Sequence, residues 1–274
     1  MREIETEVFS SEHSFYEAAH KYPEIFVIVS PPRGGSTSFA RVFWEHGTVG
    51  FYAHEPFEIV YFEHKSLKEV IKKIENPLDV RDLKKSIDMI QPNNALIIKE
   101  MPYQVGKYFP LLADIATKPL IFLLRDPRLA IASRMRKKEE VGANPIYPLI
   151  ETGWELIYSE IYHCKANRIP YMVVESDDFR NYPTKIFSRA FGKLGIHFSE
   201  EMLHWKSLPN VDIDNLHGTH SHLYKRVLLS QGIEPATEQI PPIESFSKEN
   251  GLQEHIIECL KIYEELKKDP NRIT

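Results

Sequence analysis

The stretch FVIVSPPRGGSTSFARVFW, residues 26–44, decides the fold. It passes from an apolar, β-branched run through Pro-Pro-Arg-Gly-Gly into Ser-Thr-Ser and a segment with helical character. A buried strand, a glycine-containing turn and a helix together are typical of a phosphate-binding loop, because glycines let backbone N–H groups approach an anion and the helix adds the positive end of its dipole. Taken alone, the same residues also fit a plain strand-to-helix turn with serine caps.

The loop differs from that of nucleotide kinases. Their pattern, G-x-x-x-x-G-K-[ST], places a lysine on the terminal phosphates and a hydroxyl on Mg²⁺. No such string occurs in the sequence. This difference disfavours ordinary ATP chemistry.

Apolar runs like that of residues 25–29 recur at 95–99, 119–124 and 171–176. Helical patterns alternate with them, and one begins at Asp126 as N-cap with Pro127 in the first helical position. Buried strands alternating with helices predict an α/β fold, a three-layer α/β/α arrangement around a central, mostly parallel sheet. Ligands of such sheets bind at the carboxyl ends of the strands, which places the chemistry after Val29, Lys99 and Leu124.

The rest of the chain predicts one domain over residues 1–274. Residues 60–94 are rich in Lys and Glu and indicate a helical insertion, and residues 206–247 lack periodicity and indicate an irregular loop region. Residues 248–269 repeat apolar side chains at helical spacing, which predicts a C-terminal helix.

Composition narrows the function classes. Hydrophobic residues make up 42% and charged residues 27%, a globular balance, and the net charge of −5 disfavours a nucleic-acid partner. Only two cysteines occur, which disfavours a disulfide framework or a structural zinc site. The acidic N-terminus and the lack of any apolar run near ~20 residues predict neither a signal peptide nor a membrane partner, and hence a cytoplasmic protein.

The stretch LLRDPRLAIASRMRKK, residues 123–138, is a second candidate anion site. Arg125 lies at a strand's carboxyl end, and Ser133 follows eight residues later on the helix. We interpret Arg125 as anion-binding and residues 136–138 as a solvated basic face.

The two stretches together resemble the sulfotransferases that use 3′-phosphoadenosine 5′-phosphosulfate (PAPS), whose signature pair is a strand with P-[RK]-x-G-[ST]-[ST] and a strand with R-[DN]-P-x-x-x-x-x-S. The resemblance covers roughly residues 25–205 and implies a P-loop-type fold. It assigns the 3′-phosphate to Arg125 and Ser133. It assigns the 5′-phosphosulfate to Arg33, Gly34, Gly35, Ser36, Thr37 and Ser38.

The segment HEPFE, residues 54–58, resembles the EP segment of the bacterial and carbohydrate branch. The histidine base of the cytosolic branch has no counterpart, because the matching place reads Lys99-Glu100-Met101-Pro102. A general base is still required. Glu55, Glu58 and His54 are the candidates, with Glu55 placed slightly first, and a polar loop with capping carboxylates is the plainer reading. Lys99 is a candidate for stabilising the leaving oxygen.

The HGTHSH segment, residues 217–222, invites a metal interpretation. Its histidines lack the acidic partners and helical spacing of catalytic zinc ligands, so we expect a flexible loop that could cover the acceptor. Trp44, Trp154 and Trp205 are predicted to be core residues. Tyr147 is a weaker candidate for an acceptor pocket.

The resemblance therefore implies sulfuryl transfer from PAPS to a hydroxyl or amine of a small-molecule or carbohydrate acceptor, giving 3′,5′-adenosine bisphosphate without a metal. Two alternatives stay open. One is a divergent P-loop kinase, and the other is a non-catalytic module that retains the nucleotide site.

Overall fold

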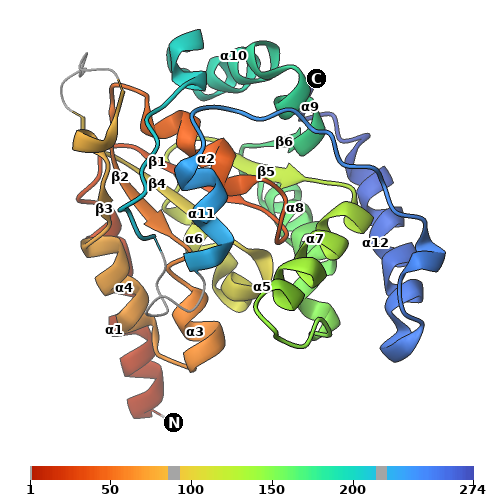
Figure 1. The fold of residues 1–274 in the computed structure, drawn as a ribbon. Helices are drawn as coiled ribbons and strands as arrows, with labels where there is room; N and C mark the ends of the chain where they lie inside the picture. The colour runs from red at the N-terminus through yellow and green to blue at the C-terminus, as the bar shows by residue number, and fades with distance from the viewer. Residues whose placement is uncertain (1, 86–92, 214–220) are drawn as a thin grey trace.

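A mostly parallel sheet forms the centre of the computed structural model, which describes residues 2–85, 93–213 and 221–274 (Figure 1). Within those residues seven strands follow the order β3-β2-β4-β1-β5-β6-β7, and only the β2–β3 pair is antiparallel. The strands are β1 (Ile25–Val29), β2 (Val49–His54), β3 (Leu78–Asp79), β4 (Ala95–Glu100), β5 (Leu120–Leu124), β6 (Tyr171–Glu175) and β7 (Arg272–Ile273). Four of them match the predicted runs, and the predicted α/β class is confirmed.

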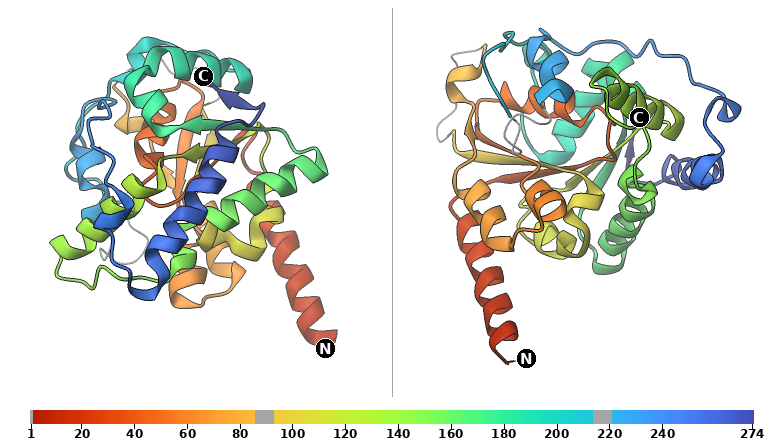
Figure 2. Two further views of the ribbon diagram at one scale, coloured as in Figure 1. Left: turned by 90° about the vertical axis from the view of Figure 1, so that its right-hand side faces the viewer. Right: turned by 60° about the horizontal axis from the view of Figure 1, so that its bottom comes forward.

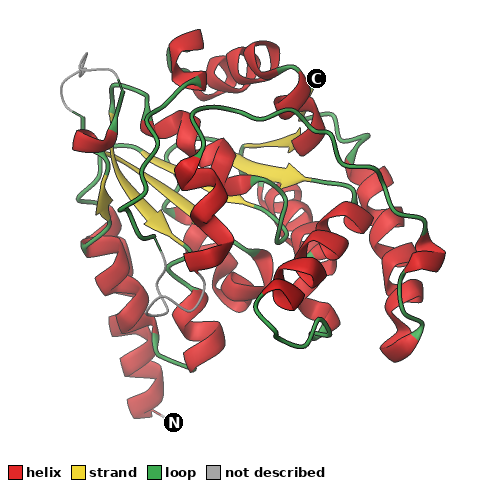
Figure 3. Cartoon of the chain, in the orientation of Figure 1, coloured by secondary structure: helices red, strands yellow, loops and turns green. Residues whose placement is uncertain are grey.

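Helices cover both faces of this sheet (Figure 3). They are α1 (Arg2–Ala19), α2 (Ser36–Trp44), α3 (Glu58–Glu63), α4 (Leu67–Glu75), α5 (Pro102–Val105), α6 (Phe109–Asp114), α7 (Pro127–Glu140), α8 (Trp154–Asn167), α9 (Ser176–Asn181), α10 (Pro183–Leu194), α11 (Ser221–Leu229) and α12 (Leu252–Leu266). Helix α7 begins as predicted, because the Asp126 side chain accepts a hydrogen bond from the backbone N–H of Arg128 at 2.9 Å.

Alternation along the central strand β1 explains the three layers. Val27 and Val29 pack into one core with α1, α4, α6, α8 and α12, whereas Phe26 and Ile28 pack into the other with α2, α10 and α11. Successive side chains of a strand point to opposite faces, so a continuous apolar run requires cover on both sides. The three tryptophans are buried in these cores, as predicted.

Three parts of the chain differ from the sequence interpretation. The region 60–94 carries the end of α3, helix α4 and the edge strand β3, and its residues 86–92 lie outside the described chain. The irregular region predicted for 206–247 contains a helix, α11, so that prediction is wrong for residues 221–229. The sequence interpretation did not include helix α1, whose N-terminal end projects from the body of the molecule (Figure 2).

Candidate active site

A cavity of about 400 Å³ opens at the carboxyl edge of the parallel sheet. The ends of β1, β2, β4 and β5 all contribute to it, as expected for this sheet type. Nine of the predicted site residues line the cavity: Arg33, Gly35, Ser36, Thr37, Ser38, Glu55, Glu58, Lys99 and Arg125. Gly34, His54 and Ser133 lie outside the lining. Predicted residues as far apart in the sequence as Arg33 and Arg125 thus line one cavity.

The loop between β1 and α2 has the backbone of an anion site. Arg33 and Gly35 have φ values of 62° and 84°, which turn the chain sharply before the helix. A Cβ at Gly35 would lie 3.0 Å from Ser176 Oγ and 3.1 Å from the Phe179 ring, so only glycine fits without strain. Within the described residues no side chain caps the first turn of α2. The first N–H groups of that helix are therefore available to an anion.

Two arginines meet beside this loop. Arg125 Nη1 donates to the carbonyl of Arg33 at 3.0 Å, and Arg33 Nε donates to Ser133 Oγ at 3.2 Å. Burial lowers the pKa of Arg33, and the charge of Arg125 lowers it further. Two arginine side chains at one partly buried loop favour the binding of an anion there.

Glu55 and Lys99 form a buried ion pair at the ends of β2 and β4, where each side chain is 1% exposed. Gln104 Nε2 donates to the other Glu55 oxygen at 2.8 Å, and the Tyr224 hydroxyl donates to Glu55 at 3.3 Å. Burial raises the pKa of Glu55, but the charges of Lys99 and His54 and the donated hydrogen bonds outweigh it and lower the pKa to about 2. Glu55 is therefore held as a carboxylate.

The turn that carries Glu55 is strained and anchored. Glu55 has a φ of 44°, although it is neither glycine nor asparagine. The turn is held by Glu100, whose Oε1 accepts the backbone N–H of Phe57 at 2.6 Å. His54 lies behind this turn, with Nδ1 2.5 Å from the Tyr52 hydroxyl and Nε2 3.3 Å from Glu55. His54 thus supports the ion pair from outside the cavity.

Glu58 faces the cavity from the first position of α3. Its backbone N–H donates to the Glu55 carbonyl at 3.0 Å, and the residue is 1% exposed. Tyr103 and Tyr224 line the cavity with it, and burial raises the pKa of both phenols. These tyrosines are therefore neutral neighbours of Glu58.

Several lining residues were missed by the sequence interpretation. Tyr224 lies on α11, whose helical character was hidden in a short segment. Arg180 and Glu238 also line the cavity, although no spacing in the sequence connects them. Lys137 and Lys138, predicted to be solvated, line it as well. Tyr147 instead lies under Arg134, 4.1 Å from ring centroid to guanidinium carbon, and is not part of the lining.

The described residues contain neither a metal site nor a membrane-spanning helix. Among residues 2–85, 93–213 and 221–274, no three His, Cys, Asp or Glu side chains converge in a way that could hold a metal ion. His217 and His220 of the HGTHSH segment lie outside the described residues, whereas His222 lines the cavity. Over the same ranges no helix combines the length and apolar character needed to cross a membrane.

Three solved structures that are similar to this fold are sulfotransferases. The sulfotransferase domain of the curacin biosynthetic pathway matches at a TM-score of 0.52 and 17% identity, covering 88% of this chain and 98% of that one. That of the Synechococcus PCC 7002 olefin synthase matches at 0.51 and 18%, covering 90% and 96%. Mouse sulfotransferase SULT7A1, solved in complex with PAP, matches at 0.50 and 12%, covering 93% and 92%.

At such identities these structures show the fold alone, and a search of curated proteins finds no match to the sequence. The family model described as "Sulfotransferase domain" matches residues 26–256. The match spans the loop after β1, the Glu55–Lys99 pair, Arg125 and α11, so it covers every element that builds the cavity. The chain therefore belongs to the sulfotransferase domain family.

Proposed function

We propose that the protein transfers a sulfuryl group from PAPS to a hydroxyl or amine of a small-molecule acceptor. The observation that carries this proposal is the convergence of the β1–α2 loop, Arg125 and the carboxylates of residues 55 and 58 on one cavity. The first two supply sites for two phosphate groups of one nucleotide. We assign to the carboxylates the position where an acceptor meets the reacting end of that nucleotide.

The donor groups of the cavity suit PAPS. Gly35 and the first turn of α2 offer backbone N–H groups, and Ser36, Thr37 and Ser38 add hydroxyls for the 5′-phosphosulfate. Arg33 adds a planar cation beside them. We assign the 3′-phosphate to Arg125, with Ser133 linked to it through Arg33.

Glu58 is the base that the geometry favours. Glu55 is committed to Lys99 and has a pKa lowered to about 2, which makes it a weak proton acceptor. His54 lies outside the cavity lining. Glu58 faces the cavity, so we assign proton removal to Glu58 and the positioning of Lys99 to Glu55.

The reaction balances with these groups alone. The acceptor oxygen bonds to sulfur while Glu58 takes the proton of the acceptor hydroxyl. The bond between sulfur and the bridging phosphate oxygen breaks. The leaving group is 3′,5′-adenosine bisphosphate. Lys99, Arg33 and the α2 backbone N–H groups stabilise the charge that develops on the phosphate oxygen.

The acceptor would enter past a mixed surface of apolar and basic side chains. Phe62, Met101, Tyr103, Val141 and Lys137 are among the residues that line the cavity. The cavity's size suits a small molecule or one unit of a carbohydrate.

Transfer of ³⁵S from labelled PAPS across a panel of small-molecule hydroxyl, amine and carbohydrate acceptors tests the proposal. We expect a labelled product with at least one acceptor class, together with stoichiometric 3′,5′-adenosine bisphosphate. Binding of the bisphosphate with no transfer to any class would indicate a non-catalytic nucleotide-binding module. Phosphoryl transfer from ATP would instead indicate a kinase.

A further inference from the structure

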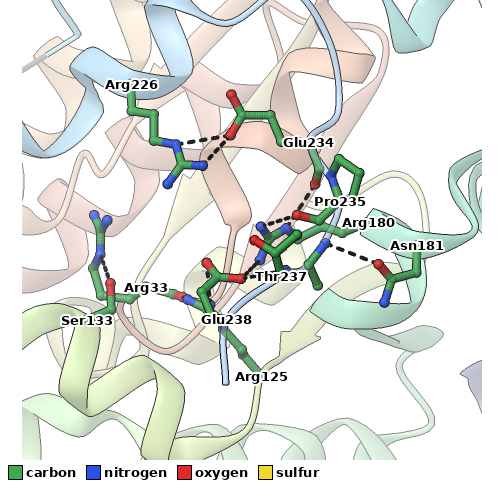
Figure 4. A network of polar contacts seen from close by, with 11 residues as sticks. Arg33, Arg125, Ser133, Arg180, Asn181, Arg226, Glu234, Pro235, Thr237 and Glu238 are labelled. Atoms are coloured by element: carbon green, nitrogen blue, oxygen red, sulfur yellow. Dashed lines mark hydrogen bonds and ion pairs between the residues drawn. The ribbon is translucent and has the colours of Figure 1, made fainter. Parts of the chain in front are cut away.

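Two arginines from different strand ends share one carboxylate in the cavity. Arg125 Nη2 lies 3.0 Å from Glu238 Oε1, and Arg180 Nη1 lies 3.1 Å from Glu238 Oε2. Arg125 follows β5, and Arg180 lies on α9 directly after β6. Figure 4 shows both guanidinium groups directed at the same carboxyl group.

Glu238 belongs to an extended segment, residues 232–238, that we call the strap. Arg180 also holds the strap through its backbone, since Nε donates to the Glu234 carbonyl at 3.1 Å and Nη2 to the Pro235 carbonyl at 2.8 Å. The backbone N–H of Ala236 donates to Asn181 Oδ1 at 3.1 Å (Figure 4). Side chains of α9 thus hold the strap at the edge of the cavity.

The electrostatics of this cluster favour a ligand with more than one negative charge. Burial lowers the pKa of Arg125, Glu238 raises it, and the nearby charge of Arg180 lowers it again. Asp177, whose pKa burial raises, is the other acid that acts on Arg125. A phosphate dianion offers three acceptor oxygens and more charge than one carboxylate, so it is the better partner for two converging guanidinium groups.

The carboxylate and a phosphate compete for the same N–H groups. Arg125 uses Nη2 for Glu238 and Nη1 for the Arg33 carbonyl, so a phosphate that binds at Nη2 takes the place of the carboxylate. Glu238 keeps 30% of its side-chain surface exposed, whereas Arg125 is 8% exposed. The acid is therefore the member of the pair that can leave toward solvent.

We propose that Arg180 binds the 3′-phosphate of the donor together with Arg125, and that Glu238 is the carboxylate which that phosphate displaces. This inference rests on the proposed function, because it takes PAPS as the donor. It adds a residue from α9 to the nucleotide site and makes the strap respond to nucleotide binding. The strap then tunes donor affinity by competition.

Calorimetric titration with two nucleotides tests the inference. 3′,5′-Adenosine bisphosphate carries the 3′-phosphate, and adenosine 5′-monophosphate lacks it. In Glu238→Gln we expect the bisphosphate to bind about tenfold more tightly, because the competing charge is gone, with monophosphate affinity unchanged within about twofold. Glu234→Gln is the matched control: it removes the same charge from the same strap, but its carboxylate pairs with Arg226.

Arg180→Ala separates a phosphate ligand from an anchor of the strap. If Arg180 binds the phosphate, its loss weakens bisphosphate binding about tenfold or more and leaves the affinity for the monophosphate unchanged. If Arg180 only anchors the strap, its loss frees the strap and the bisphosphate binds more tightly. Arg180→Lys, which keeps a charge, should recover part of the affinity. A far-ultraviolet circular dichroism melt of each variant checks that it folds.

The outcomes discriminate between the inference and the proposed function. Unchanged or weaker bisphosphate binding in Glu238→Gln overturns the inference, and so does equal tightening of both nucleotides or equal tightening in Glu234→Gln. Tighter bisphosphate binding in Arg180→Ala overturns the role of Arg180. If neither wild type nor Glu238→Gln binds the bisphosphate, the PAPS assignment itself fails.

Discussion

Lys99 and Glu55 form an ion pair at the carboxyl ends of neighbouring parallel strands, with 1% of each side chain exposed. Strand pairing sets this contact, because His54 is in register with Lys99 and the backbone N–H of Glu55 donates to the Lys99 carbonyl at 2.8 Å. The pair fixes a cation at the base of the cavity. In the proposed mechanism, Glu55 acts through Lys99 and Glu58 is the base.

The stability losses from removing the two members of this pair should not add. Glu55→Gln or Lys99→Met alone leaves a buried charge without its partner, and we expect each to lower the free energy of unfolding by about 3–5 kcal/mol. The double variant should lose clearly less than the sum of the two. Urea unfolding of the four proteins measures the coupling. Additive losses would mean that the pair contributes no coupling.

Glu55 also predicts an acid dependence of stability. Its pKa falls from 4.5 to about 2 in the folded protein, so its contribution is complete above pH 4.5 and is lost as the pH falls toward 2. Between pH 7 and pH 3, wild type should lose about 2 kcal/mol more unfolding free energy than Glu55→Gln. Urea unfolding at both pH values measures the difference. Equal losses would show that Glu55 is not held as a carboxylate.

Glu58→Gln should separate catalysis from donor binding. Loss of a general base lowers kcat by about 10²–10⁴-fold, whereas affinity for 3′,5′-adenosine bisphosphate should stay within about twofold. Glu63→Gln makes the same change at the exposed end of α3 and serves as the control. Bisphosphate production from PAPS with a turned-over acceptor is the readout. A kcat near that of wild type would remove Glu58 from the mechanism.

Gly35→Ala should damage the phosphate loop. The new Cβ would be placed at a φ of 84° and 3.0 Å from Ser176 Oγ, so we expect a loss of about 1–3 kcal/mol in unfolding free energy and weaker bisphosphate binding. Gly192→Ala is the control, because a Cβ there meets nothing within 4 Å inside helix α10. That change should be neutral or stabilising by up to about 1 kcal/mol. Similar effects at both glycines would contradict the loop assignment.

Local pattern predicted the elements that are buried on both faces. β1, β4, β5 and β6 each contain a continuous apolar run, and each is buried along its whole length. β2 was not predicted, because its VGFYAH sequence contains Gly50 and polar aromatic residues, and its pairing with β4 shifts register between Val49 and Phe51. A register shift of this kind depends on the neighbouring strand and leaves no local signal.

The cavity was predicted in part for the same reason. Arg33 and Arg125 follow buried strands, so their convergence follows from the sheet. The meeting of Arg180 with Glu238, 58 residues apart, depends on the path of the strap over α9. Helix α11 is short, and burial of Tyr224 and Leu228 against the rest of the protein gives it stability that its own sequence does not supply.

The most direct test of PAPS as donor is a thermal melt with nucleotides. Saturating 3′,5′-adenosine bisphosphate at about 100 times its Kd should stabilise wild type by about 2.7 kcal/mol and raise its Tm, whereas ATP with Mg²⁺ should leave the Tm unchanged. Arg125→Ala should lose the response to the bisphosphate. Stabilisation by ATP with Mg²⁺ and none by the bisphosphate would contradict the account.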